Sequence, residues 1–278
     1  MILDSAFADP SLRGIVASIG GDDCVRVLPH VNATAELRDP KLVMGYSDTT
    51  TLLAWLNTLG LVTFHGPAVM AGLAQARQLP RAFLAHLRAL LFEAPARFTY
   101  CPYEWHAEGY PDWSDPAQAG RVNEPRPSPG WRFLQGGVAE GRLFGGCVEV
   151  LEFLKGTRFW PAAEFWDEDR ILFLETSEEK PAPEQVMRML RNYGTQGILG
   201  RLRGLLIGRP RGYTGAQVER LDRLVLKVAR DEFSRPDLAV VSGVDFGHTD
   251  PQLVLPLGVR ARIDVERREV GLLEPPLA

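Results

Sequence analysis

The sequence lacks the features that mark membrane, secreted and nucleic-acid-binding proteins. No apolar stretch reaches the roughly 18 residues of a membrane helix, so we predict no membrane partner. The opening residues, MILDSAFADP, lack a basic region followed by an apolar one, which predicts no secretory signal. A formal net charge of −4 without any basic run argues against a nucleic-acid partner.

Cysteine is also scarce. Cys24, Cys101 and Cys147 are the only three, and they lie far apart in the chain. Their odd number and wide spacing fit neither a disulfide framework nor a metal-ligand set. We therefore expect a protein without a metal or other cofactor, in the reducing environment of the cytoplasm.

What is present is the composition of an ordinary globular protein. The 278 residues are 45% hydrophobic and 24% charged, enough for one or two domains with a substantial core. Apolar runs alternate with amphipathic segments, which predicts an α/β fold with a parallel, helix-covered sheet. We expect strands at 13–19, 41–44, 61–64, 170–174, 203–207 and 238–241. We expect helices at 22–29, 49–59, 79–92, 183–193 and 216–233. A turn plus helix at 142–154 and an antiparallel pair at 259–265 and 269–273 complete the pattern.

A change in amino-acid composition divides the chain. The segment 95–137 contains a long polar stretch rich in proline and glycine, with Trp105 and Trp113 inside it. A loop of this length is usually functional or a linker. We therefore predict an N-terminal domain over 1–94, a connecting loop over 95–137, and a C-terminal α/β domain with a mixed sheet over 138–278.

The stretch 41–59, KLVMGYSDTTTLLAWLNTL, has the pattern of a strand, a sharp corner and a helix. Leu52, Trp55, Leu56 and Leu59 share one helical face, and a glycine follows. A serine at such a corner, Ser47, has the geometry of a nucleophile elbow, with the helix N-terminus beside it. A serine or aspartate that simply caps the helix explains the same pattern.

A nucleophilic serine needs a base and an acid that orients it. His248 directly follows the strand at 238–241, and strand ends are where site residues converge in parallel sheets. His65 also ends a strand, although a structural histidine fits that place better. The remaining histidines carry no catalytic cue: His30, His86 and His106.

Glu175 ends the apolar run RILFLE. Its carboxylate either orients the imidazole or is only the first solvated group after a strand. The chain order of serine, glutamate and histidine is that of α/β-hydrolases. Thr49, however, stands where the second glycine of their G-x-S-x-G motif belongs, which argues against that fold.

Taken together, segments along nearly the whole chain resemble the LD-carboxypeptidase family of serine peptidases. These segments are AFADPSLRGIVASIGGDD, PKLVMGYSDTTTLL, TFHGP, GRLFGGCVEVLEFLKGT, ILFLETSEEKPAPEQV, GLLIGRP and GVDFGHTDPQLVLPLGVRARID. The resemblance implies that Ser47 is the nucleophile, Glu175 the acid and His248 the base. The glycine pair after the first strand matches the family's oxyanion loop, so the implied oxyanion donors are the backbone N–H groups of Gly21 and Asp48, with Gly20 beside the substrate.

The resemblance leaves the substrate open between two branches of the family. One removes the terminal D-amino acid from murein tetrapeptides, and the other, the microcin C immunity branch, cleaves an amide between a peptidyl or aminoacyl group and a modified nucleotide. The long insertion favours the second branch. There Trp105 or Trp113 can stack on a nucleobase, although either can equally pin the loop to the domain. A binding remnant without activity is a third reading, and a homodimer is an assembly that we consider.

Two departures from the family pattern stand out. Members usually begin with about 60 further residues, on the order of two βα units, so we expect this chain to open in the middle of a truncated N-terminal domain. The sheet beneath the glycine loop would then have an exposed edge. Cys147 stands where asparagine is common in the family, and a small buried thiol is our expectation for it.

Overall fold

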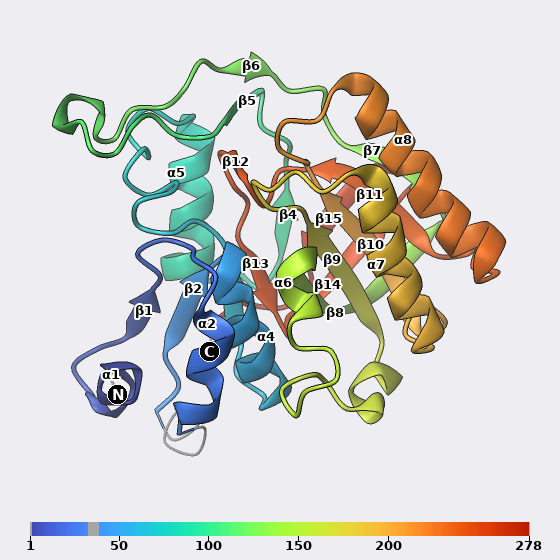
Figure 1. The fold of residues 1–278 in the computed structure, drawn as a ribbon, viewed down its shortest axis with the longest axis horizontal. Helices are drawn as coiled ribbons and strands as arrows, with labels where there is room; N and C mark the ends of the chain where they lie inside the picture. The colour runs from blue at the N-terminus through green and yellow to red at the C-terminus, as the bar shows by residue number, and fades with distance from the viewer. Residues whose placement is uncertain (1, 33–38, 278) are drawn as a thin grey trace.

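The computed structural model describes residues 2–32 and 39–277 and builds them into two main sheets and one small sheet (Figure 1). The first sheet has the strand order β1 (Gly14–Val16), β2 (Leu42–Gly45), β3 (Thr63–His65) and β13 (Leu255–Leu257). Its first three strands are parallel, and β13 pairs antiparallel with β3. This is the predicted parallel sheet around the serine corner.

The second sheet is mixed, as expected for the C-terminal part. Its strand order is β4 (Phe98–Tyr100), β15 (Glu269–Leu272), β14 (Arg260–Asp264), β8 (Val138–Cys147), β9 (Arg170–Glu175), β10 (Leu202–Gly208), β11 (Ala239–Val244) and β7 (Arg132–Gln135). The central strands β8 to β11 are parallel. On one side β14 pairs antiparallel with β8, followed by β15 and β4, also antiparallel, and on the other side β7 pairs antiparallel with β11. The predicted α/β class with a parallel and a mixed sheet is confirmed.

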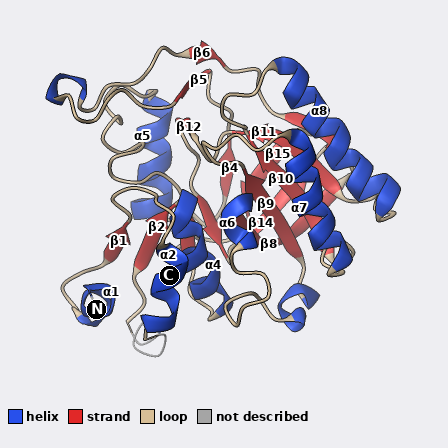
Figure 2. Cartoon of the chain, viewed as in Figure 1, coloured by secondary structure: helices blue, strands red, loops and turns tan. Residues whose placement is uncertain are grey.

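The described helices largely follow the predicted amphipathic segments. They are α1 (Ile2–Ala8), α2 (Cys24–Val27), α4 (Thr50–Thr58), α5 (Arg81–Arg88), α6 (Val148–Glu152), α7 (Pro183–Thr195) and α8 (Gly215–Leu226). Short 3-10 or π turns extend several of them: η1 (Leu28–His30), η2 (Ser47–Thr49), η3 (Ala89–Glu93), η4 (Pro116–Gln118), η5 (Ala163–Asp167) and η6 (Lys227–Glu232). Helix α4 contacts both β3 and β8, so it lies between the two main sheets (Figure 2). No helix in the described ranges is long and apolar enough to cross a membrane.

The prediction of a turn plus helix over 142–154 was wrong in its first half. The residues up to Cys147 belong to β8, and only α6 is helical. Gly145 and Gly146 suggested a turn, but they serve a close approach between elements. A Cβ at Gly145 would lie 1.8 Å from the carbonyl oxygen of Phe173, and one at Gly146 would lie 2.4 Å from the side chain of Thr50. Glycine here allows the strand to press against its neighbours.

The connecting segment is more structured than the predicted loop. It contributes β4 and β7 to opposite edges of the second sheet. Its strands β5 (Trp105–Glu108) and β6 (Arg126–Pro127) form the small sheet with β12 (Thr249–Asp250). The division at 94 and 137 stays a prediction about domain organisation.

Candidate active site

Ser47 sits at a strained corner at the end of β2. Tyr46 is extended, with φ −153° and ψ −169°, and Ser47 then takes a φ of +57° before η2 and α4 begin. A positive φ is uncommon for a residue other than glycine and costs of order 1–3 kcal/mol. Among the described hydrogen bonds, none joins the Ser47 or Asp48 side chain to the start of α4, and Asp48 bonds to Asp23 and Cys24 instead. The corner is therefore the predicted strand–elbow–helix rather than an ordinary capped turn.

The glycine loop after β1 lies directly against this corner. A Cβ at Gly20 would lie 2.9 Å from Oγ of Ser47. Oδ2 of Asp48 accepts hydrogen bonds from the backbone N–H groups of Asp23 (3.1 Å) and Cys24 (2.9 Å). Burial raises the pKa of the Asp48 carboxyl, and these two bonds oppose the rise. Asp48 thus holds the beginning of α2, and with it the glycine loop, onto the elbow.

His248 and Glu175 form a buried pair at the carboxyl ends of the second sheet. Nδ1 of His248 lies 2.7 Å from Oε2 of Glu175, whose side chain is fully buried. Glu175 ends β9 and His248 follows β11, and both strands are parallel to β10 between them. The Tyr46 ring packs edge-on against the imidazole, with centroids 4.9 Å apart. The contacts with Glu175 and Tyr46 therefore fix the orientation of the imidazole.

The other imidazole nitrogen faces a second acid. Nε2 of His248 lies 2.8 Å from Oε2 of Glu178, close enough for an ion pair but without the alignment of a hydrogen bond. Burial lowers the pKa of His248, but the charges of Glu175 and Glu178 outweigh it and raise that pKa to about 10. The contact with His248 lowers the pKa of Glu178 to about 2. The two acidic side chains on either side of the ring therefore favour the protonated form of His248.

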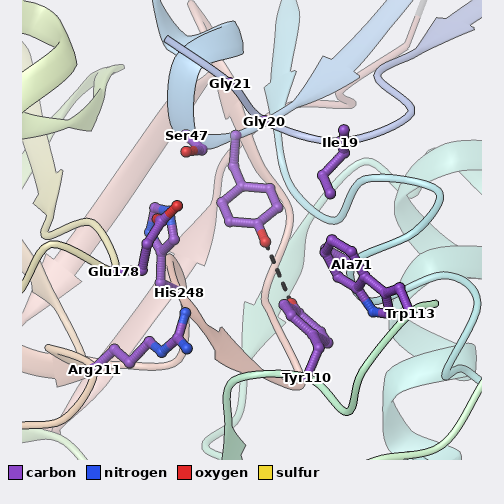
Figure 3. Close-up of a pocket in the computed structure, with 11 residues that line it drawn as sticks. Ile19, Gly20, Gly21, Ser47, Ala71, Tyr110, Trp113, Glu178, Arg211 and His248 are labelled. Carbon is purple, nitrogen blue, oxygen red and sulfur yellow. Dashed lines mark hydrogen bonds and ion pairs between the residues drawn. The ribbon is translucent and has the colours of Figure 1, made fainter. Parts of the chain in front are cut away.

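A pocket of about 290 Å³ joins these elements (Figure 3). Its lining residues come from the glycine loop, the elbow, the connecting segment and the second sheet: Ile19, Gly20, Gly21, Tyr46, Ser47, Ala71, Tyr110, Trp113, Glu178, Arg211 and His248. Within the described ranges, no hydrogen bond joins Ser47 directly to His248. The serine and the imidazole nevertheless line one cavity, with Glu178 between the pocket and Nε2.

The predicted site residues fall into three groups. Ser47, His248, Gly20, Gly21 and Trp113 line the pocket, and Asp48 and Glu175 hold them from behind. Trp105 is half-buried in β5 and lies outside the described lining of the pocket.

His65 is fully buried below the site, where its ring packs against Phe173 and Phe246. Burial lowers its pKa to about 4, so it is neutral at physiological pH. This agrees with the structural reading of His65.

Cys147 is the small buried thiol that we expected. It is fully buried, and its sulfur lies 3.6 Å from Oε2 of Glu149. Burial raises its pKa well above the ordinary value, which disfavours the thiolate. Across 2–32 and 39–277, no three or more His, Cys, Asp or Glu side chains are grouped so that they could hold a metal ion.

Sequence reasoning missed six lining residues, the apolar Ile19 and Ala71 and four polar ones. Tyr46 and Tyr110 face each other across the pocket, with their hydroxyl oxygens 3.3 Å apart, and Glu178 and Arg211 bring opposite charges to it. Glu178 had a signal that could have found it, because it lies three residues after Glu175 in the same strand-end loop. Tyr110 and Arg211 lie in segments without a motif and only the fold brings them here.

Sequence profiles match two parts of the chain. The LD-carboxypeptidase N-terminal domain matches residues 2–66, and the LD-carboxypeptidase C-terminal domain matches residues 140–263. The microcin C7 self-immunity protein MccF of Escherichia coli is 29% identical over 97% of this chain and 76% of its own. A probable murein peptide carboxypeptidase of Bacillus subtilis is 27% identical over 99% of this chain and 77% of its own.

Solved structures agree with these matches. An MccF-like protein from Streptococcus pneumoniae in complex with AMP superposes with a TM-score of 0.81 at 28% identity, covering 97% of this chain and 81% of that one. MccF in complex with aspartyl sulfamoyl adenosine superposes with a TM-score of 0.82 at 25% identity, covering 99% of this chain and 80% of that one. Because both domains of one family match in order and the fold agrees over nearly its whole length, this chain belongs to the LD-carboxypeptidase family.

Proposed function

We propose that this protein is a serine peptidase or amidase in which Ser47 is the nucleophile, His248 the general base and Glu175 the acid that orients it. The observation that carries the proposal is the buried Glu175–His248 pair beside a serine held at positive φ. An acid in this position fixes the imidazole tautomer and stabilises the imidazolium. The strained corner presents the Ser47 hydroxyl to the pocket.

The reaction follows from these positions. Once the imidazolium has lost its Nε2 proton to water, Oγ of Ser47 attacks the carbonyl carbon of the scissile amide while Nε2 of His248 takes the hydroxyl proton. The carbon–nitrogen bond then breaks, and the imidazolium gives that proton to the leaving amine. Water attacks the resulting ester with His248 again as base, which releases the acid and regenerates the serine. The chemistry requires no metal ion.

The oxyanion of the intermediate needs donors beside the elbow. We assign this role to the backbone N–H groups of Gly21 and Asp48, next to the pocket and to the start of η2. Removal of one such donor typically costs about 10²–10³ in kcat. The anchoring of the loop by Asp48 supports this assignment, because preorganised donors need no rearrangement during the reaction.

For the substrate we favour a peptidyl- or aminoacyl-nucleotide of the microcin C type. Trp113 lines the pocket and is 41% exposed, so one face of its ring is free to meet a nucleobase. Relatives carrying AMP and aspartyl sulfamoyl adenosine show what related sites accept. The murein relative supports a second candidate, removal of a terminal D-amino acid from a murein tetrapeptide.

A side-by-side assay of the two candidate substrates tests both proposed reactions. Purified protein is incubated with an aminoacyl-sulfamoyl adenosine and with a murein tetrapeptide, and amine release is followed. We expect turnover of the nucleotide, and we expect Ser47→Ala to abolish it without changing the unfolding midpoint. Full activity in that variant would rule out the mechanism. Turnover of the tetrapeptide alone would assign the murein reaction.

The third reading, a binding remnant without activity, is tested by a serine-reactive fluorophosphonate. We expect wild-type protein to be labelled and Ser47→Ala to remain unlabelled. Equal labelling of both, together with no turnover of either substrate, would favour the remnant. Light scattering on the same samples measures whether the protein forms the homodimer that we consider.

A further inference from the structure

The carboxylate of Glu178 contacts the imidazole nitrogen of His248 that the proposed reaction needs. A general base must present its free nitrogen to the serine hydroxyl, and Nδ1 of His248 is already committed to Glu175. Nε2 is therefore the working nitrogen, yet its nearest charged neighbour is Oε2 of Glu178 at 2.8 Å. Figure 3 shows the Glu178 carboxylate against the imidazole, on the face that lines the pocket. The ligand-free site is thus capped.

The cap can leave without any movement of the backbone. The loop after β9 is anchored one residue earlier, where the backbone N–H and hydroxyl of Ser177 donate to Oε1 of the largely buried Glu149 at 3.0 and 2.7 Å. Lys180 closes the turn with an N–H donated to the carbonyl of Ser177. The Glu178 side chain itself is 52% exposed, whereas His248 is 4% exposed. Rotation of one side chain is enough to free Nε2.

What draws the carboxylate away must be positively charged. Glu178 must exchange its contact with a charged imidazole for one of similar strength, and an ammonium group offers a carboxylate both an opposite charge and hydrogen-bond donors. An ammonium group next to the scissile bond would reach the same pocket and replace the imidazolium as the partner of Glu178. The chain's own cation there, Arg211, makes no ion pair or hydrogen bond in the described ranges and is free to face an anionic group of the ligand.

We propose that Glu178 is the receptor for a substrate ammonium group and that it caps Nε2 of His248 until such a group arrives. Binding of the cation takes Glu178 away from the imidazolium, whose Nε2 proton then passes to water and leaves the neutral base. The substrate class is an amide with a free amine close to the scissile carbonyl, as in an aminoacyl-nucleotide or an unblocked peptide. This inference rests on the proposed function of Ser47 and His248. It adds which substrates the same pocket selects.

Matched substrate pairs test this selection. One pair is an aminoacyl-sulfamoyl adenosine and its N-acetyl form, and the other is a peptide with a free amine and its N-acetyl form. We expect wild-type protein to prefer the free amine by at least about tenfold in kcat/KM, the effect of one charge-assisted hydrogen bond. Glu178→Gln and Glu178→Ala are expected to remove most of that preference. The pair that shows the preference identifies the source of the ammonium group.

The cap is tested with a reagent that has no ammonium group. The fluorophosphonate reacts with the serine once the base is free, so we expect Glu178→Ala to be labelled several-fold faster than wild type. The matched control is Glu179→Gln, which removes the same charge from the exposed neighbouring position. We expect it to leave both the labelling rate and the substrate preference at wild-type values. Unfolding midpoints verify that each variant is folded.

The outcomes separate the two proposals. If Glu178→Ala is labelled more slowly than wild type and keeps the preference for free amines, Glu178 only positions His248 and the cap is wrong. An unchanged labelling rate with unchanged preference also overturns it. In both cases, labelling that still requires Ser47 would continue to support the proposed function. If instead Ser47→Ala is labelled as fast as wild type, the proposed function fails, and the capping inference fails with it.

Discussion

Oδ2 of Asp48 accepts a hydrogen bond from the backbone N–H of Cys24 at 2.9 Å, which ties the elbow to the segment that follows the glycine loop. The same oxygen accepts the N–H of Asp23 at 3.1 Å. Two segments distant in sequence are therefore held in register at the point where an oxyanion would form. The geometry of the proposed oxyanion hole therefore depends on the side chain of Asp48.

The first prediction concerns this anchor. Asp48→Ala removes both bonds and is expected to lower kcat by about 10² or more, the cost of one misplaced oxyanion donor. Asp48→Asn keeps an acceptor oxygen and is expected to lose less. Steady-state kinetics measures both, with the exposed Asp22→Ala as the control. Equal activity of all three variants would show that the loop does not need Asp48.

The second prediction concerns the space above Ser47. The Cβ of Gly20→Ala would meet both Cβ and Oγ of Ser47 at 2.9 Å. Displacement of the nucleophile by about 1 Å can cost about 10²-fold in rate, so we expect that loss in fluorophosphonate labelling. Gly137→Ala is the matched control, because a Cβ there meets nothing within 4 Å. Wild-type labelling of Gly20→Ala would place the reacting atoms elsewhere.

The third prediction concerns Trp113. Its ring lies 5.3 Å from that of Tyr110 at 37°, and its exposed side faces solvent at the pocket. Base stacking on an aromatic ring is worth about 1–3 kcal/mol, so Trp113→Ala should raise KM for a nucleotide substrate by about five- to 150-fold. The same change should leave KM for a peptide substrate nearly unchanged. Trp105→Ala, outside the pocket, serves as control, and an equal effect of both variants would contradict stacking.

The fourth prediction concerns the pH dependence of stability. Burial opposes protonation of His248, but Glu175 and Glu178 raise its pKa from 6.5 to about 10. The ion pairs therefore stabilise the fold fully below pH 6.5, and this contribution is lost as the pH rises through about 10. Urea unfolding at pH 6, 8 and 10 measures the loss. We expect His248→Gln to weaken the dependence of the unfolding free energy on pH, and the exposed His30→Gln to leave that dependence unchanged.

The fifth prediction concerns a buried acid beside the pocket. Burial raises the pKa of Asp250 from 3.8 to about 6, while Tyr110 and Gln252 oppose the rise. The folded protein thus holds the proton more tightly than the unfolded chain, and stability falls as the pH rises from about 4 to above 6. Asp250→Asn mimics the neutral form and should stabilise the protein at pH 8 more than at pH 4. Asp112→Asn changes an exposed carboxylate bonded to Ser114 and should not stabilise the protein more at pH 8 than at pH 4. A stabilisation by Asp250→Asn that is the same at both pH values would contradict this account.

Local pattern was sufficient for much of the fold. The strand, corner and helix at 41–59, the buried strand ending at Glu175 and the amphipathic helix α8 were all predicted, because each depends on residues that are neighbours in sequence. The pairing of Leu143 and Phe144 with β9 was not predicted. Glycines that signal a turn locally also permit close packing, and only the partner strand decides between the two.

The amino-acid sequence by itself determined the family, the α/β architecture and the identity of the serine, glutamate and histidine that we assign to catalysis. The tertiary structure alone decided what surrounds them. Arg211 and Tyr110 reach the pocket from segments far from the elbow, and Glu178 lies against the imidazole through the path of one loop. Such contacts depend on how elements pack rather than on what any short stretch of chain prefers, so no local pattern encodes them.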